Sequence, residues 1–219
     1  MTKTGAAATG STFDDRTESL IDWARTNAKP IGIAVAVLAL AAIVWVVAKQ
    51  WQDRRADAAE VALNRARQSY AQGNLPLAQT DLRRVISRFG GSSAGSQATM
   101  LLAQTFYEQG KPDSGLKVLN EGKAAGLDKA AFEALKGAGL EQEKKYAEAA
   151  DRYRAAAGLT DSKIAKDRYM ADAARVLTAA GNKAEAAKIW STLANDEGST
   201  FAAEARVRYG ELTAVPAKP

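Results

Sequence analysis

Residues 137–156, GAGLEQEKKYAEAADRYRAA, contain the pattern that decides the fold. The small residue Gly137 comes seven positions before Lys144, and the small residue Ala149 comes five positions after it. The bulky side chain of Tyr153 follows four residues later. Two antiparallel helices that pack closely need small residues where their axes cross and a bulky residue beside the crossing. The stretch therefore predicts two helices that are joined by a tight turn at Lys144.

The same spacing occurs four times, and the turn positions lie 37, 34 and 37 residues apart. The turns are expected at Gly73, Gly110, Lys144 and Gly181. The small residues before the turns are Ala66, Ala103, Gly137 and Ala174, those after them are Ala78, Gly115, Ala149 and Ala186, and the bulky residues are Leu82, Leu119, Tyr153 and Trp190. Glycine at such a turn allows the left-handed backbone that reverses the chain after a helix. The repetition predicts four helix pairs.

This pattern, with a period near 34 residues, resembles the tetratricopeptide repeat. The third copy is the most complete, whereas the second carries Gly115 and Gly122 where alanine is usual, and the first has Ser69 at an aromatic position. The resemblance implies an α-α superhelical solenoid in which each pair packs on its neighbours. The alternative is an ordinary helical bundle in which the spacing of the alanines is coincidental.

The segments around the pairs fit a repeat stack. Polar connectors at residues 90–93 and 159–162 separate pairs, and residues 200–212 form one more expected helix, in which Phe201, Ala205 and Tyr209 share a face. Such a helix is the solvating cap that a repeat stack requires. We therefore predict an all-α fold with a repeat domain over residues 49–212 and a disordered tail over residues 213–219.

An apolar stretch, IGIAVAVLALAAIVWVVA, occupies residues 31–48 and contains no charge, amide or hydroxyl. A helix of this length spans about 27 Å, close to the hydrocarbon thickness of a bilayer. Lys29 and Lys49 bound the stretch, and Trp45 and Trp51 fall where an aromatic belt would lie. We predict a single transmembrane helix over residues 31–48.

A cleavable signal peptide is the alternative, because residues 46–48, VVA, could form a cleavage site. The apolar core is longer than that of a usual signal peptide, and the region before it is long and mixed in charge. Within this region, residues 1–13 are small and polar and are expected to be disordered. Residues 14–29 are expected to form an amphipathic helix along the membrane interface, and Pro30 separates them from the span.

The distribution of basic residues bears on the side of the membrane that the repeats occupy. Three basic residues lie shortly before the span and five follow it, at Lys49, Arg54, Arg55, Arg65 and Arg67. The positive-inside rule then places the repeat domain in the cytoplasm. Long domains translocate largely regardless of charge, so composition alone leaves the orientation open.

Composition excludes several kinds of site. The chain has no cysteine and no histidine, which removes thiol nucleophiles, His-based triads, zinc sites and haem ligation by His or Cys. The net charge of +5 indicates a mild excess of basic residues, which is expected to be spread along the chain. Nucleic-acid binding is therefore not expected. Carboxylate pairs such as Glu141 and Glu143 are expected to be solvated, so we predict no enzyme, no cofactor, no metal and no small-molecule substrate. The alternative is a hydrolase, which needs two acids within about 10 Å in a pocket.

A repeat stack binds partners through its curved inner surface, which is lined by the first helix of each pair. The positions one and four residues after the small residue of each first helix are expected to face this surface. The candidate partner-binding residues are Arg67, Tyr70, Gln104, Tyr107, Glu141, Arg175 and Thr178. Tyr70 and Tyr107 could anchor an extended peptide or a partner helix. Alternatively, both tyrosines pack between repeats.

The arrangement of residues 23–51, with the run WARTNAK, one apolar span, a tryptophan just past it and alanine-rich helix pairs beyond, resembles the YfgM-like family. Members of this family are ancillary subunits of the SecYEG translocon with a tetratricopeptide-like domain. The resemblance implies a single-pass protein of the bacterial inner membrane with a periplasmic repeat domain. It also implies association with translocon subunits, periplasmic chaperones or secreted clients. It carries no functional residue over to this chain.

We therefore expect a scaffold that is held in the bilayer by residues 31–48 and binds partner proteins near the translocon. Such tethering raises the effective concentration of a partner at the membrane. An adaptor for cell-envelope assembly, serving outer-membrane or cell-wall machinery, is the alternative function.

Overall fold

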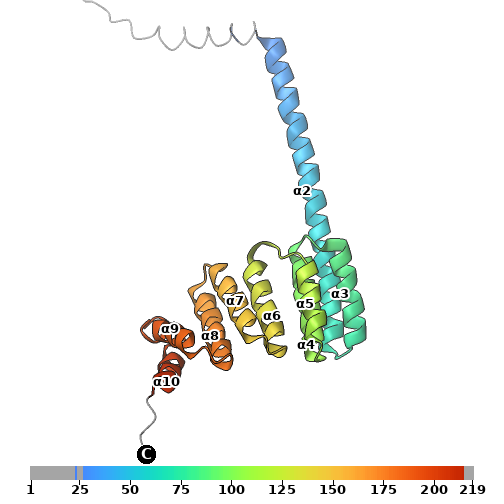
Figure 1. The fold of residues 1–219 in the computed structure, drawn as a ribbon. Coiled ribbons are helices and arrows are strands. Elements are labelled where there is room, and N and C mark those ends of the chain that lie inside the picture. The colour runs from blue at the N-terminus through green and yellow to red at the C-terminus, as the bar shows by residue number, and fades with distance from the viewer. Residues whose placement is uncertain (1–22, 24–26, 215–219) are drawn as a thin grey trace, which may run out of the picture. The chain divides into compact units, whose positions relative to one another are not determined.

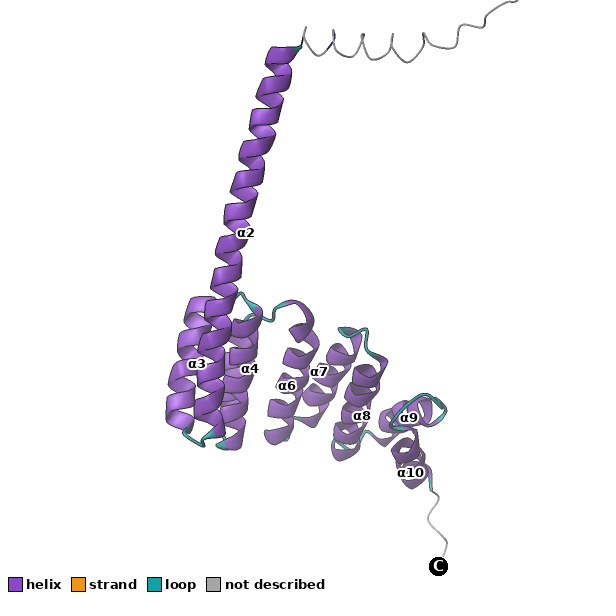
Figure 2. Cartoon of the chain, turned by 180° about the vertical axis from the view of Figure 1, so that it is seen from behind, coloured by secondary structure: helices purple, strands orange, loops and turns teal. Residues whose placement is uncertain are grey.

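The computed structural model describes residue 23 and residues 27–214 of the chain. The regular elements in these residues are all helices, which confirms the expected all-α fold (Figures 1 and 2). The predicted tail over residues 1–13 lies outside the described residues. So do most of the predicted amphipathic helix over residues 14–29 and the last five residues of the tail over residues 213–219.

The chain divides into two compact units, residues 1–55 and 56–219, and the boundary lies inside helix α2 (Ala28–Ala71). Pro30 lies in the first turn of this helix, where its missing N–H is tolerated. The sequence from residue 33 to residue 72 contains neither glycine nor proline, so no local signal ends the helix at residue 48. The apolar stretch and the first helix of the first pair are therefore parts of one 44-residue helix.

The N-terminal part of α2 is apolar and exposed. An 18-residue window in it has a mean hydropathy of 2.9, and none of the window is buried. Leu38, for example, leaves 69 % of its surface exposed. By length and composition, this helix can cross a membrane, a test that a signal sequence near the N-terminus also passes.

The second unit is a stack of antiparallel helices in which α3 to α10 follow one another in chain order (Figure 1). The elements are α3 (Leu75–Phe89), α4 (Ser93–Glu108), α5 (Pro112–Glu121), η1 (Gly126–Asp128), α6 (Lys129–Gln142), α7 (Tyr146–Gly158), α8 (Lys163–Ala179), α9 (Lys183–Ala194) and α10 (Ala202–Thr213). The end of α2 pairs with α3, and α4/α5, α6/α7 and α8/α9 form the next three pairs, with α10 behind them. This is the predicted solenoid of four pairs and one further helix.

All four expected turns adopt the left-handed backbone conformation. The φ angles are 74° at Gly73, 68° at Gly110, 61° at Lys144 and 81° at Gly181. In each turn, the N–H of the following residue donates to the carbonyl five residues earlier, as Lys145 does to Leu140 at 2.9 Å. This hydrogen bond satisfies a carbonyl that the end of the helix leaves without a partner.

Lys144 is the one non-glycine residue among these four turns, and a side chain disfavours positive φ by about 1 kcal/mol. We expect Lys144→Gly to raise the free energy of unfolding by about that amount, as measured by chemical denaturation. The reciprocal change Gly110→Lys should lower it by a similar amount. Equal stability of Lys144→Gly and the unchanged chain would show that the turn carries no strain.

The predicted crossing positions are buried. Four of the alanines at these positions are fully buried, with 0 % of their surface exposed: Ala66, Ala103, Ala149 and Ala174. The bulky residues beside the crossings are buried as well. Three apolar clusters result, one at each end of the second unit and a smaller one between them. The cluster at the C-terminal end includes residues of α6 to α10, and Trp190 is its largest side chain.

Candidate functional site

The seven candidate partner-binding residues lie on the first helices of the four pairs. Arg67 and Tyr70 lie on α2, Gln104 and Tyr107 on α4, Glu141 on α6, and Arg175 and Thr178 on α8. Arg67, Gln104, Glu141 and Thr178 are exposed, Tyr70 and Arg175 are half-buried, and Tyr107 is buried.

Arg67 and Tyr70 link α2 to α4, the first helices of neighbouring pairs. Arg67 on α2 donates hydrogen bonds to Asn64 at 3.2 Å and to Gln97 on α4. The hydroxyl of Tyr70 donates to the carboxylate of Glu108, also on α4. This hydrogen bond, together with burial, raises the pKa of Tyr70 above its ordinary value. The polar end of Tyr70 is therefore engaged within the repeat stack.

Tyr107 packs between repeats, which is the alternative to anchoring a partner. Only 7 % of its surface is exposed, and its hydroxyl donates to the carbonyl of Leu135 at 3.1 Å. Burial first, and then the negative charge of Glu143, raises its pKa well above the ordinary range. A buried tyrosine of this kind cannot anchor a partner at the surface without unpacking.

The ring of Tyr107 also explains an irregularity of the second repeat, which carries Gly115 where alanine is usual. A Cβ atom at this position would lie 2.2 Å from Cε1 of Tyr107. The glycine therefore leaves the space that the ring fills.

Glu141 is engaged in the next repeat, where it accepts a hydrogen bond from the hydroxyl of Tyr153 at 3.1 Å.

Arg175 is the centre of a charged network that joins α8 to α10. Its Nε and one terminal nitrogen donate to the two oxygens of Glu204 at 3.1 and 2.8 Å, and the other terminal nitrogen donates to Asp172. Its guanidinium also lies over the rings of Trp190 and Phe201, at 5.9 and 5.8 Å from their centres. The two parallel hydrogen bonds to one carboxylate make this a geometrically specific pair.

The network shifts the pKa values of its members in opposite directions. The hydrogen bonds from Arg175 hold the pKa of Glu204 below its ordinary value, against the effect of burial. Burial raises the pKa of Asp172, although Arg175 and Arg168 oppose it. Glu204 therefore stabilises the folded state in its charged form, and Asp172 is less favourably placed in that form.

The contribution of Glu204 predicts a pH dependence. It is complete above the unfolded pKa of about 4.3 and is lost as the pH falls through the lower folded pKa. Glu204→Gln should lower the free energy of unfolding by about 1 kcal/mol at pH 7. Denaturation curves should show this difference shrinking towards zero as the pH falls below about 4. The exposed residue Glu197, changed to Gln, is the control, and a pH-independent difference for Glu204→Gln would contradict the assignment.

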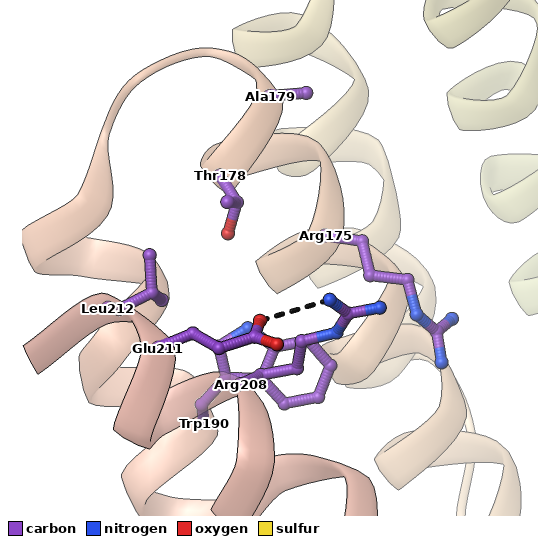
Figure 3. A pocket seen from close by; sticks show the side chains of 7 residues that line it. All are labelled: Arg175, Thr178, Ala179, Trp190, Arg208, Glu211 and Leu212. Atoms are coloured by element: carbon purple, nitrogen blue, oxygen red, sulfur yellow. Dashed lines mark hydrogen bonds and ion pairs between the residues drawn. The ribbon is translucent and has the colours of Figure 1, made fainter. Parts of the chain in front are cut away.

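Arg175 and Thr178 meet at a pocket of about 380 Å³ between α8, α9 and α10 (Figure 3). Its lining residues are Arg175, Thr178, Ala179, Trp190, Arg208, Glu211 and Leu212. Arg208 donates to Glu211 at 3.1 Å, and Figure 3 shows this ion pair near the Trp190 ring. The pocket thus combines an apolar floor with a charged rim.

The pocket offers groups that can hold a ligand. The hydroxyl of Thr178 donates its hydrogen to the carbonyl of Ala174 at 2.8 Å, so its oxygen can still accept a hydrogen bond. Of the seven lining residues, Glu211 alone is a carboxylate, so this pocket lacks the two acids that a hydrolase needs. In the part of the chain that the structure describes, no group of three or more acidic residues is placed to hold a metal ion.

Five lining residues are not among the sequence-based candidates, and one of them is Ala179, which follows Thr178 on α8. The repeat pattern predicts Trp190 as a bulky packing residue, and its contact with the pocket depends on the position of α10. Arg208, Glu211 and Leu212 lie on α10 itself, which was expected to serve as a cap. Their spacing of three and four residues marks one face of that helix, which is the signal that could have pointed to them.

The comparison with protein families agrees with this geometry. The family model described as a tetratricopeptide repeat-like domain matches residues 49–171, more than half of the chain. The chain belongs to this family. Tetratricopeptide repeat-like domains mediate protein–protein interactions and are typically non-catalytic scaffolds. A comparison with curated protein sequences finds no match to this chain.

The matched stretch ends inside α8, at residue 171. The pocket, which is lined by residues 175–212, lies entirely beyond it. The matched stretch thus covers the stack up to the middle of α8, and the pocket is built by the rest of α8 together with α9 and α10.

Proposed function

We propose that the chain is a membrane-anchored scaffold that binds partner proteins at the bacterial inner membrane. One observation carries the proposal: a domain of a family that mediates protein–protein interactions begins at residue 49, directly after an exposed apolar stretch long enough to cross a bilayer. The anchor supplies location, and the repeat domain supplies recognition. Together they raise the effective concentration of a partner at the membrane.

The contacts at the end of the apolar stretch support an anchor over residues 31–48. Lys49 Nζ lies 5.3 Å from the centre of the Trp45 ring, and the guanidinium of Arg55 lies 5.5 Å from that of Trp51. Aromatic rings with adjacent cations are typical of the boundary between the hydrocarbon region and water. This pattern favours a retained span.

The state of the N-terminus separates an anchor from a signal peptide. We expect the full chain to stay in the membrane fraction after alkaline carbonate extraction. Mass spectrometry of the purified protein should find the residues before Lys49 still attached. A mature protein that begins at Lys49 would overturn the anchor and leave the repeat domain untethered.

The pocket between α8, α9 and α10 supports a site of partner contact, because an apolar floor beside Trp190 and Leu212 can hold one side chain of a partner segment. The acceptor oxygen of Thr178 can bind an N–H of the same segment. A photo-crosslinking residue placed at Thr178 of the full chain should therefore capture partners in cells. The same residue at Lys188, exposed on α9, is the control, and equal capture at both positions would exclude the pocket as the contact.

For the identity of the partners, we propose that the protein is an accessory of the Sec translocon that links it to periplasmic chaperones. The resemblance of residues 23–51 to the YfgM-like family supports this. Purification of the full chain in mild detergent should recover translocon subunits. Recovery of cell-wall synthases or outer-membrane assembly proteins without translocon subunits would instead favour an adaptor for envelope assembly.

The proposal places the repeat domain in the periplasm, although the basic residues after the span favour the cytoplasm. Protease added to intact spheroplasts should digest the repeat domain if it is periplasmic. Protection in spheroplasts, with digestion only after lysis, would refute this orientation while leaving the scaffold function intact.

A further inference from the structure

The repeat unit has two edges, because each helix pair turns on one edge and is connected to the next pair on the other. The turn edge holds residues 73–74, 110–111, 144–145 and 181–182. The connector edge holds residues 90–92, 122–128, 159–162 and 195–201. Figure 2 shows the connectors before α6 and α8 on the same side of the stack. Ala59 of α2 shares an apolar cluster with Phe89 and Ala94, so residue 56, where the unit begins, also lies at the connector edge.

The connector edge exposes large aliphatic side chains. Leu127 leaves 98 % of its surface exposed, Ile164 66 % and Leu159 50 %. Leu159 lines a hollow of about 230 Å³ together with Ala124 and Lys129, so the connectors before α6 and α8 lie close to each other. The turn edge, by contrast, has only glycine, asparagine and lysine at its turn residues. The two edges of the unit therefore differ in chemistry.

Two lysines accompany the aliphatic side chains of the connector edge. Lys123 and Lys129 lie on either side of Leu127, and both are exposed. In the part of the chain that the structure describes, neither ammonium group forms an ion pair. Aliphatic side chains beside lysines are typical of segments that lie in the interface of a membrane. There the apolar groups leave water, and the ammonium groups reach the lipid phosphates.

The tether of the repeat unit brings this edge close to the bilayer. The seven residues from 49 to 55 separate the predicted span from the unit, and all of them belong to helix α2. Seven helical residues advance about 10 Å, whereas the headgroup layer on one side of a bilayer is about 5–8 Å thick. The chain therefore enters the repeat unit near the outer limit of the headgroups, and it enters at the connector edge.

We propose that the connector edge of the repeat unit contacts the surface of the bilayer that anchors the chain. Leu127 and Ile164 enter the apolar part of the interface, and Lys123 and Lys129 lie among the headgroups. This inference rests on the membrane anchor of the proposed function and adds a second contact between the chain and the membrane. The contact restricts the rotation of the repeat unit about its tether. It applies on either side of the membrane.

The test uses the full chain in vesicles of phosphatidylethanolamine and phosphatidylglycerol. Because the chain has no cysteine, one introduced cysteine carries a fluorescent label at a known position. Gly158→Cys places the label beside the connector edge, where an added Cβ meets no atom within 4 Å. Ala180→Cys places it at an exposed position on the turn edge. Lipids with a nitroxide on the headgroup should quench the label at position 158 at least about twofold more than the label at position 180.

The double variant Leu127→Gln/Ile164→Gln should lower the quenching at position 158 to that at position 180, because it removes the apolar contact and leaves the charges unchanged. The matched control is Leu77→Gln/Val207→Gln, which removes aliphatic side chains that are 46 % and 60 % exposed from positions outside the connectors. The control should leave the quenching unchanged. All four side chains are exposed, so both double variants should keep the unfolding midpoint of the unchanged chain.

Flotation of the full chain with the vesicles measures the anchor separately. A chain that does not float with the vesicles would overturn the anchor and, with it, the contact of the connector edge. A chain that floats but shows equal quenching at positions 158 and 180 would overturn the contact alone and leave the proposed function intact. Equal loss of quenching in both double variants would also overturn the contact, since the aliphatic side chains of the connector edge would then have no special part in it.

Discussion

Trp190→Ala is expected to lower the free energy of unfolding by about 3–5 kcal/mol, the cost of truncating a large buried aromatic residue. Trp190 has 1 % of its surface exposed and is the largest fully buried side chain of the described residues. It belongs to the cluster that joins α6 to α10, and it also forms the floor of the pocket. Its removal leaves a cavity that helices α8, α9 and α10 cannot all close.

The loss should be local, because each helix pair of a repeat stack contacts only its neighbours. Hydrogen exchange should show lost protection in α8, α9 and α10, whereas α3 and α4, which share a separate apolar cluster, should remain protected. Trp51→Ala is the matched control, since Trp51 is 63 % exposed and its truncation should change stability by less than about 0.5 kcal/mol. Uniform loss of protection in all helices would show that the repeats unfold as one unit.

The repeat architecture could be predicted from the sequence because its signals are local. The left-handed turn after a helix requires a particular backbone conformation, which glycine adopts at low cost, so its position shows in the sequence. The repeat spacing alone predicts a turn at Lys144, and its φ of 61° confirms this turn. The packing of the repeats therefore outweighs the preference of a lysine for negative φ. The small residues at the crossings follow from helix packing in the same way.

Other features depend on contacts that the sequence does not display. The sequence changes from apolar to polar after residue 48, but no glycine or proline interrupts the helix there. Helix α2 therefore continues to Ala71. The spacing of Arg208 and Glu211 marks one face of α10, but their place in the pocket depends on the position of α10 against α8. Tyr107 occupies the same position of its repeat as the half-buried Tyr70. Its burial depends on Gly115 in α5 and Gly139 in α6, which leave room for its side chain.

The second large effect on stability is expected for Tyr107, whose side chain packs against Gly115 and Gly139. Tyr107→Ala should lower the free energy of unfolding by about 3–5 kcal/mol, because the ring is buried and its hydroxyl bonds to the carbonyl of Leu135. In the unchanged chain, Gly139→Ala should also be destabilising, by about 1–3 kcal/mol. The added Cβ would lie 2.4 Å from the hydroxyl oxygen of Tyr107 and 2.9 Å from Leu116 Cδ2.

The two changes should not be additive. Without the Tyr107 side chain, the chief obstacle at Gly139 is gone, and the flexible end of Leu116 can move aside. Alanine then stabilises the interior of α6 relative to glycine by about 1 kcal/mol, so Gly139→Ala should change sign in the Tyr107→Ala background. Chemical denaturation of the two single variants and the double variant measures this coupling. If Gly139→Ala costs the same in both backgrounds, the glycine is not there to make room for the tyrosine, and the packing of Tyr107 between repeats would have to be revised.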